Sequence, residues 1–352
     1  MQNPNKSGTS WTGYAGLCLG IILIAYLFSQ IDLAGAIGRI SIIGFSSLFI
    51  LLPYLGLHVL ETIAWFKLFP ESKTPISFFK LLKIQLIAET VSMTLPAGVA
   101  IGEPLRPFLC LRFMAIPIPA GVASVAVRKL MLGLAQGIYT VFCAVAGFSF
   151  LQAVSIKMLG FEGLGFIMIG TGIVLFFIFL FLFLILLNGK AATTLHGFLM
   201  LVPFRKVKSW LLSKESEFLD TDVELKHFNG PFSAQLVPSM LIYVLAWFMF
   251  AIESYIILNL LGIQVSFFQV LAIDATLTML RVLFFFIPSG LGVQDLGYMA
   301  FFQALGIQDF LVYGGAFVLL RRFKELLWYA FGYGIMFFSG VNLHDAEQVD
   351  NS

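Results

Sequence analysis

Residues 95–112 read L-P-A-G-V-A-I-G-E-P-L-R-P-F-L-C-L-R, and this stretch decides the fold of the chain. It places three prolines and two glycines beside Glu103 and Arg106, within a sequence that is otherwise strongly apolar. Broken backbone at membrane depth is tolerated only where protein covers it or water reaches it. A charged side chain at the bilayer centre adds roughly 2.5–3.5 kcal/mol to the cost of insertion. Such an arrangement predicts a functional segment.

A second stretch, residues 287–295, repeats the same order as I-P-S-G-L-G-V-Q-D. When the two stretches are aligned on their prolines, the offset is 192 residues (288 − 96 = 192), and Glu103 falls on Asp295. The predicted breaks in the helices are Pro96, Gly98 and Gly102 in the first stretch and Pro288, Gly290 and Gly292 in the second.

Further similarities extend this correspondence beyond the two stretches. The same offset joins Glu61 to Glu253 (253 − 61 = 192), and A-S-V-A-V-R-K-L from Ala123 is similar to A-F-V-L-L-R-R-F from Ala316. These matches predict an internal duplication. Paired apolar segments interrupted by glycine and proline in two halves of a chain indicate the binding site of a transporter.

The composition defines the class of protein. Of the 352 residues, 59% are hydrophobic, 11% are charged and 39 are phenylalanine. Soluble domains carry roughly 25% charged residues, whereas apolar runs of about 20 residues mark membrane helices. The formal net charge of +2 gives no sign of the clustered basic face of a nucleic-acid-binding protein. The three cysteines and four histidines lack ligand spacing, so we expect neither a metal site nor a cofactor.

The distribution of apolar runs predicts an all-α polytopic membrane protein. Residues 11–29, 41–69, 119–150, 160–187, 235–261 and 310–339 are predicted to span the membrane. Residues 77–113 and 267–305 are interrupted and carry charges, which favours a re-entrant hairpin in each half, the first ending in a short helix that starts at Glu103. Six spans and two hairpins average about three spans and one hairpin per repeat, although four of the spans fall within 1–187 and two within 233–340. An odd number of crossings per repeat makes the second repeat inverted. If each hairpin crosses the bilayer instead, the repeats are parallel and eight segments span it.

The polar segments divide the chain. We expect a first membrane repeat at 1–187, a linker with one amphipathic surface helix at 188–232, a second repeat at 233–340 and a polar tail at 341–352. The linker carries most of the positive charge outside the apolar runs, so the positive-inside tendency places it and both termini in the cytoplasm.

The motifs also resemble a known family. G-E-P-L-R at residues 102–106, the basic pairs that follow each motif, and I-P-S-G-L-G-V-Q-D are similar to the membrane domain of lysylphosphatidylglycerol synthases, which also occurs alone in flippase-like proteins. The similarity covers roughly residues 40–339. In bifunctional members a soluble domain makes aminoacylated lipid and the membrane domain translocates it. The resemblance implies lipid translocation in a bacterial-type plasma (inner) membrane, without the transferase activity.

Glu103 and Arg106 are the first candidate binding residues. They are three residues apart, on one face of the predicted short helix. Glu103 near the helix N-terminus would be stabilised by the helix dipole, and Arg106 would bind a lipid phosphate. The alternative is a helix cap and an arginine that extends to the membrane interface.

The other candidates are charged residues within apolar segments. Arg128, Lys129, Arg321 and Arg322 either line a path for an anionic headgroup or neutralise Glu103, Asp295 and Glu325. Glu61 and Glu253 are candidates for binding a coupling proton, with structural ion pairing as the alternative. Asp274 and Arg281 lie seven residues apart and are predicted to form a structural pair.

The predicted function is that of a lipid translocase or lipid transporter moving a lipid with a polar headgroup, with membrane lipids as its partners. We do not expect an enzyme, because the sequence shows neither a catalytic cluster nor a nucleotide-binding motif. Two alternatives stay open: an ion-coupled carrier of a small polar solute, and a non-transporting partner of a lipid-biosynthesis enzyme. The oligomeric state is left open.

Replacing Glu103 by glutamine tests the role of this carboxylate. Glu103→Gln keeps the size of the side chain and removes its charge, so it is expected to abolish lipid movement in proteoliposomes while leaving protein abundance unchanged. Movement at the wild-type rate would rule out the proposed role.

Overall fold

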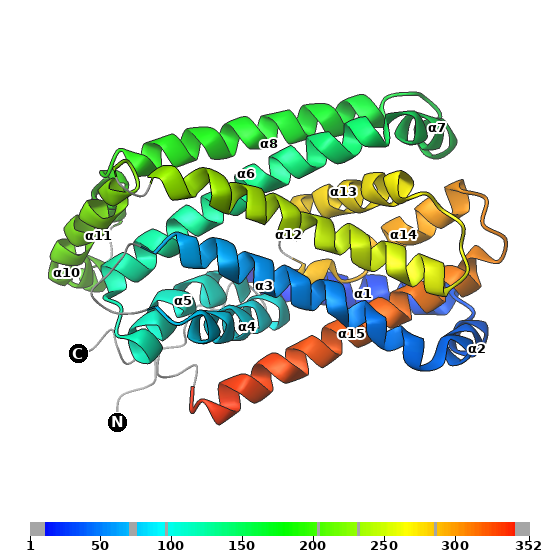
Figure 1. The fold of residues 1–352 in the computed structure, drawn as a ribbon, viewed down its shortest axis with the longest axis horizontal. Coiled ribbons are helices and arrows are strands. Elements are labelled where there is room, and N and C mark those ends of the chain that lie inside the picture. The colour runs from blue at the N-terminus through cyan, green and yellow to red at the C-terminus, as the bar shows by residue number, and fades with distance from the viewer. Residues whose placement is uncertain are drawn as a thin grey trace.

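The computed structural model describes residues 11–69, 76–95, 98–202, 205–230, 233–284 and 287–341, and these residues form helices joined by short turns. Most of the long helices run along the long axis of the molecule (Figure 1). The first half contains α1 (Trp11–Gln30), α2 (Leu33–Ile43), η1 (Gly44–Ile50), α3 (Leu51–Lys67), α4 (Phe78–Thr94), α5 (Gly98–Met114), α6 (Ile118–Ala146), α7 (Phe148–Leu159) and α8 (Leu164–Leu187). The remainder contains α9 (Ala191–Leu199), α10 (Arg205–Ser213), α11 (Glu215–His227), α12 (Ser233–Leu260), α13 (Phe267–Leu283), η2 (Pro288–Gly290), α14 (Val293–Ala304) and α15 (Phe310–Phe338).

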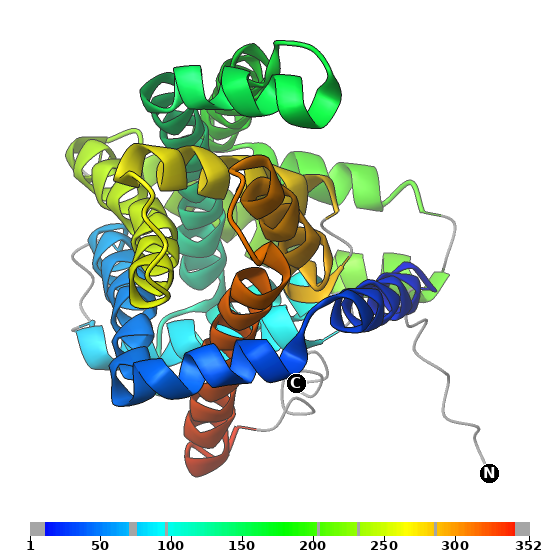
Figure 2. The same cartoon turned by 90° about the vertical axis from the view of Figure 1, so that its right-hand side faces the viewer.

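The long apolar helices are those of an integral membrane protein. Within the described part of the chain, four segments are long and apolar enough to cross a bilayer: Leu33–Lys67, Ile118–Ala146, Leu164–Leu187 and Ser233–Leu260. Only 11% of the most apolar part of Leu164–Leu187 is buried inside the protein, as expected for a helix whose surface contacts lipid. Viewed down the long axis, α7 lies at the top of Figure 2, α1 lies at the right, and the end of α15 extends beyond α2 at the bottom.

The motif at residues 95–112 forms the second arm of an antiparallel helix pair. Gly102 packs so closely on α4 that a Cβ atom there would lie 2.0 Å from Ser92 Oγ and 2.6 Å from Ala88 O. At the far end of the pair, Lys80 Nζ donates to Phe113 O at 2.8 Å. Glycine therefore permits the close approach of the two helices.

The start of α5 differs from the sequence prediction. We expected a short helix from Glu103, after a break over residues 96–102. Instead α5 begins at Gly98 and continues through Pro104 and Pro107. Pro96, one of the predicted breaks, lies outside the described residues.

The second motif also joins two antiparallel helices, with a more irregular turn. Ser289, Gly290 and Gly292 have φ angles of 51°, 61° and 77°, the left-handed region that glycine adopts most readily. Gln294 Nε2 in α14 donates to Leu277 O in α13 at 3.3 Å, so the two arms pack against each other beyond the turn.

The turn of the second helix pair contacts the end of α4 in the first pair. The pair α4–α5 lies in the left half of Figure 1 and the pair α13–α14 in the right half. Ser289 Oγ donates to Met93 O at 3.1 Å, near the end of α4, and shares a hydrogen bond of 2.8 Å with Tyr329 OH of α15. The second motif is thus held against the end of α4, directly before the first motif.

The linker folds differently from the prediction of one amphipathic helix. It forms three short helices, α9, α10 and α11. Asp222 of α11 is buried and accepts hydrogen bonds from the backbone N–H groups of Ala192 and Thr193, at 2.8 and 3.0 Å. A carboxylate at the start of α9 satisfies donors that the helix itself leaves free, and this contact packs α11 against α9.

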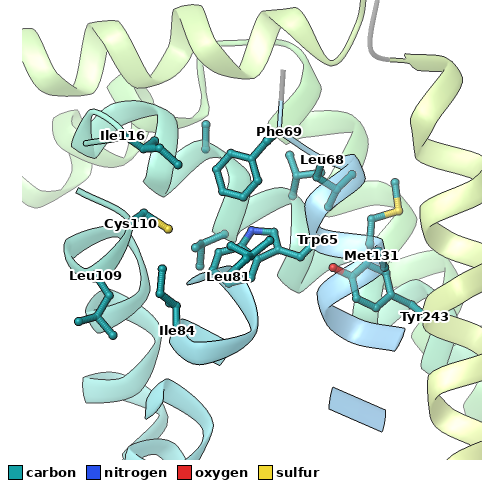
Figure 3. Packing of buried hydrophobic residues seen from close by; sticks show 14 of the residues in the cluster. Trp65, Leu68, Phe69, Leu81, Ile84, Leu109, Cys110, Ile116, Met131 and Tyr243 are labelled. Atoms are coloured by element: carbon teal, nitrogen blue, oxygen red, sulfur yellow. The ribbon is translucent and has the colours of Figure 1, made fainter. Parts of the chain in front are cut away.

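The hydrophobic core of the first half holds the α4–α5 pair in place. Figure 3 shows Trp65 of α3 among Leu81 and Ile84 of α4, with Cys110 of α5 and Tyr243 of α12 nearby. Trp65 has no exposed surface. This packing fixes the helix pair relative to α3 and α12.

Glycine substitution tests the packing of the helix pair. Gly102→Ala is expected to lower the free energy of unfolding by about 1–3 kcal/mol, because the added methyl group overlaps α4. Gly38→Ala in α2 is the matched control, since a Cβ atom there meets nothing within 4 Å. Thermal unfolding in detergent should show a lower midpoint for the first variant only. Equal midpoints would contradict the close packing.

Candidate functional site

A polar cavity of about 210 Å³ lies beside the meeting point of the two motifs. Its wall includes Ser92 and Met93 at the end of α4 and Ser289 of η2. The charged side chains that line it are Glu61, Glu89, Glu103, Arg128, Lys129, Arg281, Arg321, Lys324 and Glu325. Most of the charged residues that the sequence placed inside apolar segments therefore gather around one space.

Arg106 holds the α4–α5 pair together and does not line this cavity. Its side chain is fully buried, and its Nε and Nη2 donate to Glu103 and Glu89, each at 3.2 Å. Its Nη1 donates to Gln85. All three guanidinium nitrogens thus have protein acceptors, so neither the predicted contact with a lipid phosphate nor an extension to the membrane interface fits the structure.

Arg128 connects three helices in the same network. Its Nη2 donates to Glu61 Oε2 of α3 at 2.7 Å and to Gln85 Oε1 of α4 at 3.0 Å. The guanidinium groups of Arg106 and Arg128 lie 5.7 and 5.6 Å from the ring of Trp65, within the range of a cation–π interaction. Opposite charges and an aromatic ring together offset the cost of burying two arginines.

Glu103 sits deeper in its helix than we expected. It lies five residues after the first residue of α5, away from the N-terminal turn where the helix dipole acts. Its charge is instead balanced by Arg106 and by Lys129, whose Nζ lies 2.8 Å from Glu103 Oε1.

In the second half, Asp295 lies near the N-terminus of its helix, which is the position that was predicted for its counterpart, Glu103. It lies in the first turn of α14 and accepts a hydrogen bond from Gly292 N at 2.9 Å, so the dipole of α14 does favour its charge. Arg322 donates to Asp295 and also to Glu325, the latter at 2.5 Å. Glu253 pairs with Lys324 Nζ at 2.9 Å, and both side chains are almost fully buried.

The predicted pair of Asp274 and Arg281 is absent. Asp274 accepts hydrogen bonds from Tyr139 OH at 2.9 Å and Tyr298 OH at 3.3 Å, whereas Arg281 lies 5.7 Å from the ring of Phe250. Seven residues of helix rise about 10.5 Å, so two side chains on one face can be too far apart to touch.

Two cavity-lining arginines keep N–H groups without hydrogen-bond acceptors. Arg321 Nη2 donates to Gln294 Oε1 at 3.2 Å, but its Nε and Nη1 have no hydrogen-bond partner, and the same holds for Nε and Nη1 of Arg128. Arg128 Nη1 lies 3.9 Å from Glu103 Oε2, and Arg321 Nε lies 3.9 Å from Glu325 Oε1, both too far for a hydrogen bond. An unsatisfied buried donor costs about 1–3 kcal/mol, so these groups favour an anionic ligand.

Several members of the site had no role in the sequence analysis. They are Gln85, Glu89, Lys324 and the aromatic residues Tyr54, His58 and Trp247. The polar residues stood out in the sequence as charges or an amide inside apolar segments, but no binding role was predicted for them. The aromatic residues carried no such signal among so many others. In the described ranges, no three His, Cys, Asp or Glu side chains lie together as a metal site requires.

Comparison with known families agrees with the motifs. The model of the family described as the lysylphosphatidylglycerol synthase TM region matches residues 13–331, from α1 into α15. The chain belongs to this family, which bears out the resemblance that the two motifs carry. Searches of curated proteins and of solved structures returned no match.

The pair of Glu253 and Lys324 gives a stability test. Lys324→Met leaves a buried carboxylate without its partner and should cost about 3–5 kcal/mol of unfolding free energy. The double variant Glu253→Gln, Lys324→Met removes both charges and should recover most of that loss. Thermal unfolding of the wild type, both single variants and the double variant measures the coupling. Additive effects would show that the two charges do not depend on each other.

Proposed function

We propose that this chain moves a lipid with a phosphate-containing polar headgroup across or out of the membrane, and that the polar cavity holds the headgroup. The observation that carries the proposal is the pair of buried arginines, Arg128 and Arg321, which both line one space and each keep two nitrogens without a hydrogen-bond acceptor. Phosphate oxygens accept hydrogen bonds from guanidinium groups in two-pronged geometry. Membership of a family named for a lipid synthase agrees with a lipid substrate.

We also propose that the two halves are inverted repeats. The helices α6 and α15 have 29 residues each, and their first residues are 192 apart (310 − 118 = 192), the offset of the motifs. The pair of Glu103 and Lys129 in the first half has its counterpart in Asp295 and Arg322. The equal helix lengths and this matching ion pair support the proposed repeat.

The lengths of the helices support the proposal of re-entrant hairpins. The helices α4, α5 and α13 have 17 residues each, about 25 Å, and α14 has 12, about 18 Å. Each is shorter than the hydrocarbon core, which is about 30 Å thick. Two pairs that enter from opposite sides and touch at their turns would place the polar cavity near the midplane. With the basic linker on the cytoplasmic side, both termini would lie there too, in a plasma membrane of the bacterial type.

The proposal for proton coupling is stronger for Glu61 than for Glu253. Glu61 lines the polar cavity and is held by Arg128, so a ligand that attracts Arg128 would change its environment. Glu253 pairs with Lys324 and is not part of the cavity wall. Transport, rather than catalysis, is the activity that this arrangement of paired charges supports.

A lipid-movement assay tests the function. The protein is reconstituted in phosphatidylcholine vesicles, and a fluorescent phosphatidylglycerol is the probe. Arg321→Gln removes N–H donors that are proposed to bind the headgroup. Arg281→Gln removes another positive charge from the cavity wall, and among the described residues Arg281 forms no ion pair with an acidic residue that would be left unpaired. Hydrogen bonds to charged groups contribute about 1.5–3 kcal/mol, so each variant should weaken headgroup binding roughly tenfold to a hundredfold.

Arg39→Gln is the matched control. Arg39 is exposed in α2, where its guanidinium lies 4.7 Å from the ring of Tyr313, and it does not line the cavity. This variant should move lipid at the wild-type rate. Full activity in both cavity variants, or activity with a neutral headgroup alone, would contradict the proposal. Uptake of a small anion without lipid movement would favour a solute carrier.

A further inference from the structure

A second hollow lies between α4 and α15, and we call it the apolar groove. It has a volume of about 700 Å³, within the range of roughly 300–1,000 Å³ that is common for ligand pockets. Its wall includes Leu82 and Leu86 of α4 and Trp328, Phe331 and Gly334 of α15. The lining is largely hydrocarbon, in contrast to the charged wall of the polar cavity.

Three aromatic rings separate the two hollows. Tyr54 and His58 of α3 line the polar cavity, and Trp328 lines the apolar groove. The ring centre of Trp328 is 5.6 Å from those of both Tyr54 and His58, which are 4.6 Å apart. His58 Nδ1 and Trp328 Nε1 are buried and have no hydrogen-bond partner. Rings from the walls of the two hollows are thus in contact, and neither of these nitrogens is held by a hydrogen bond.

The two hollows follow the same pair of helices. On α4, Leu86 lines the groove and Glu89 lines the cavity, less than one helical turn away. On α15, Glu325 lines the cavity and Trp328 lines the groove, again three residues apart. The change from a charged to an apolar wall therefore takes place within one helical turn on both helices.

We propose that the apolar groove takes a hydrocarbon chain of the lipid whose headgroup enters the polar cavity, with the ring of Trp328 at the boundary between the two parts. This inference rests on the proposed function and adds the path of the hydrocarbon chain of the lipid. An amphiphile needs a polar and an apolar surface a few atoms apart, which is the arrangement on either side of these rings. A soluble anion would make no use of the groove. Since the bilayer is as apolar as the groove, the groove directs the chain and adds little affinity.

Gly334 offers a way to fill the groove without disturbing the fold. A Cβ atom at Gly334 meets nothing within 4 Å, so the ring of Gly334→Phe has room to extend along the groove. Gly170→Phe is the matched control: Gly170 in α8 is exposed, is equally free of neighbours and lies outside the groove. Both variants should keep the thermal midpoint of the wild type.

The experiment uses a phosphatidylglycerol with a photoreactive group in its acyl chain, in phosphatidylcholine vesicles. In wild type and Gly170→Phe, labelling should fall on α4 and α15 around Leu82 and Phe331. Gly334→Phe should lose this labelling and reduce lipid movement to the level of vesicles without protein. Arg321→Gln should lose the labelling too, because the chain enters only with its headgroup.

The outcomes separate the two proposals. Groove labelling that is unchanged in Arg321→Gln would identify ordinary surrounding lipid and overturn the inference. Lipid movement that is lost in Arg321→Gln but retained in Gly334→Phe would overturn the path of the chain and leave the proposed function standing. A wild-type protein that moves no phospholipid would overturn the proposed function and the inference with it.

Discussion

Charge compensation in an apolar interior is the constraint on which the rest of the structure depends. Arg106 and Arg128 are almost completely buried, and an unpaired charge in such a place is too costly to persist. Glu61, Glu89 and Glu103 surround them, joined through the amide of Gln85. Because these side chains come from α3, α4, α5 and α6, the helices must assemble together for any one of the charges to be satisfied. The network thereby fixes the wall of the polar cavity.

The second half compensates its buried charges with different residues. At the offset of 192, Arg106 corresponds to Tyr298, whose hydroxyl donates to Asp274 and shares a hydrogen bond with Ser254. A neutral hydroxyl needs fewer opposing charges than a guanidinium group, so the second half carries a smaller ionic network in its helix pair. In both halves one arginine that lines the cavity, Arg128 or Arg321, is left with N–H groups that no protein acceptor satisfies.

Much of the class and outline of this protein could be predicted from its sequence. Apolar runs indicated the membrane helices, and the two broken motifs indicated the family, which the family match confirms. Spacing along one helix identifies residues on a shared face but does not identify the helix that packs against that face. It therefore suggested a pair of Asp274 and Arg281 that does not form. For the same reason it predicted a lipid phosphate as the partner of Arg106, which contacts Gln85, Glu89 and Glu103 instead. The early start of α5 and the three linker helices depend on contacts with α4 and α9, which lie outside any local pattern.

The tryptophans have a consequence for how this protein can be observed. Three of its five tryptophans surround the site: Trp247 lines the polar cavity, Trp328 stands at its boundary and Trp65 lies beside two guanidinium groups. Indole emission responds to nearby charge and to water. The intrinsic fluorescence of the unlabelled protein is therefore weighted toward the region where a ligand would enter, and a titration could follow occupancy in native lipid without any attached dye.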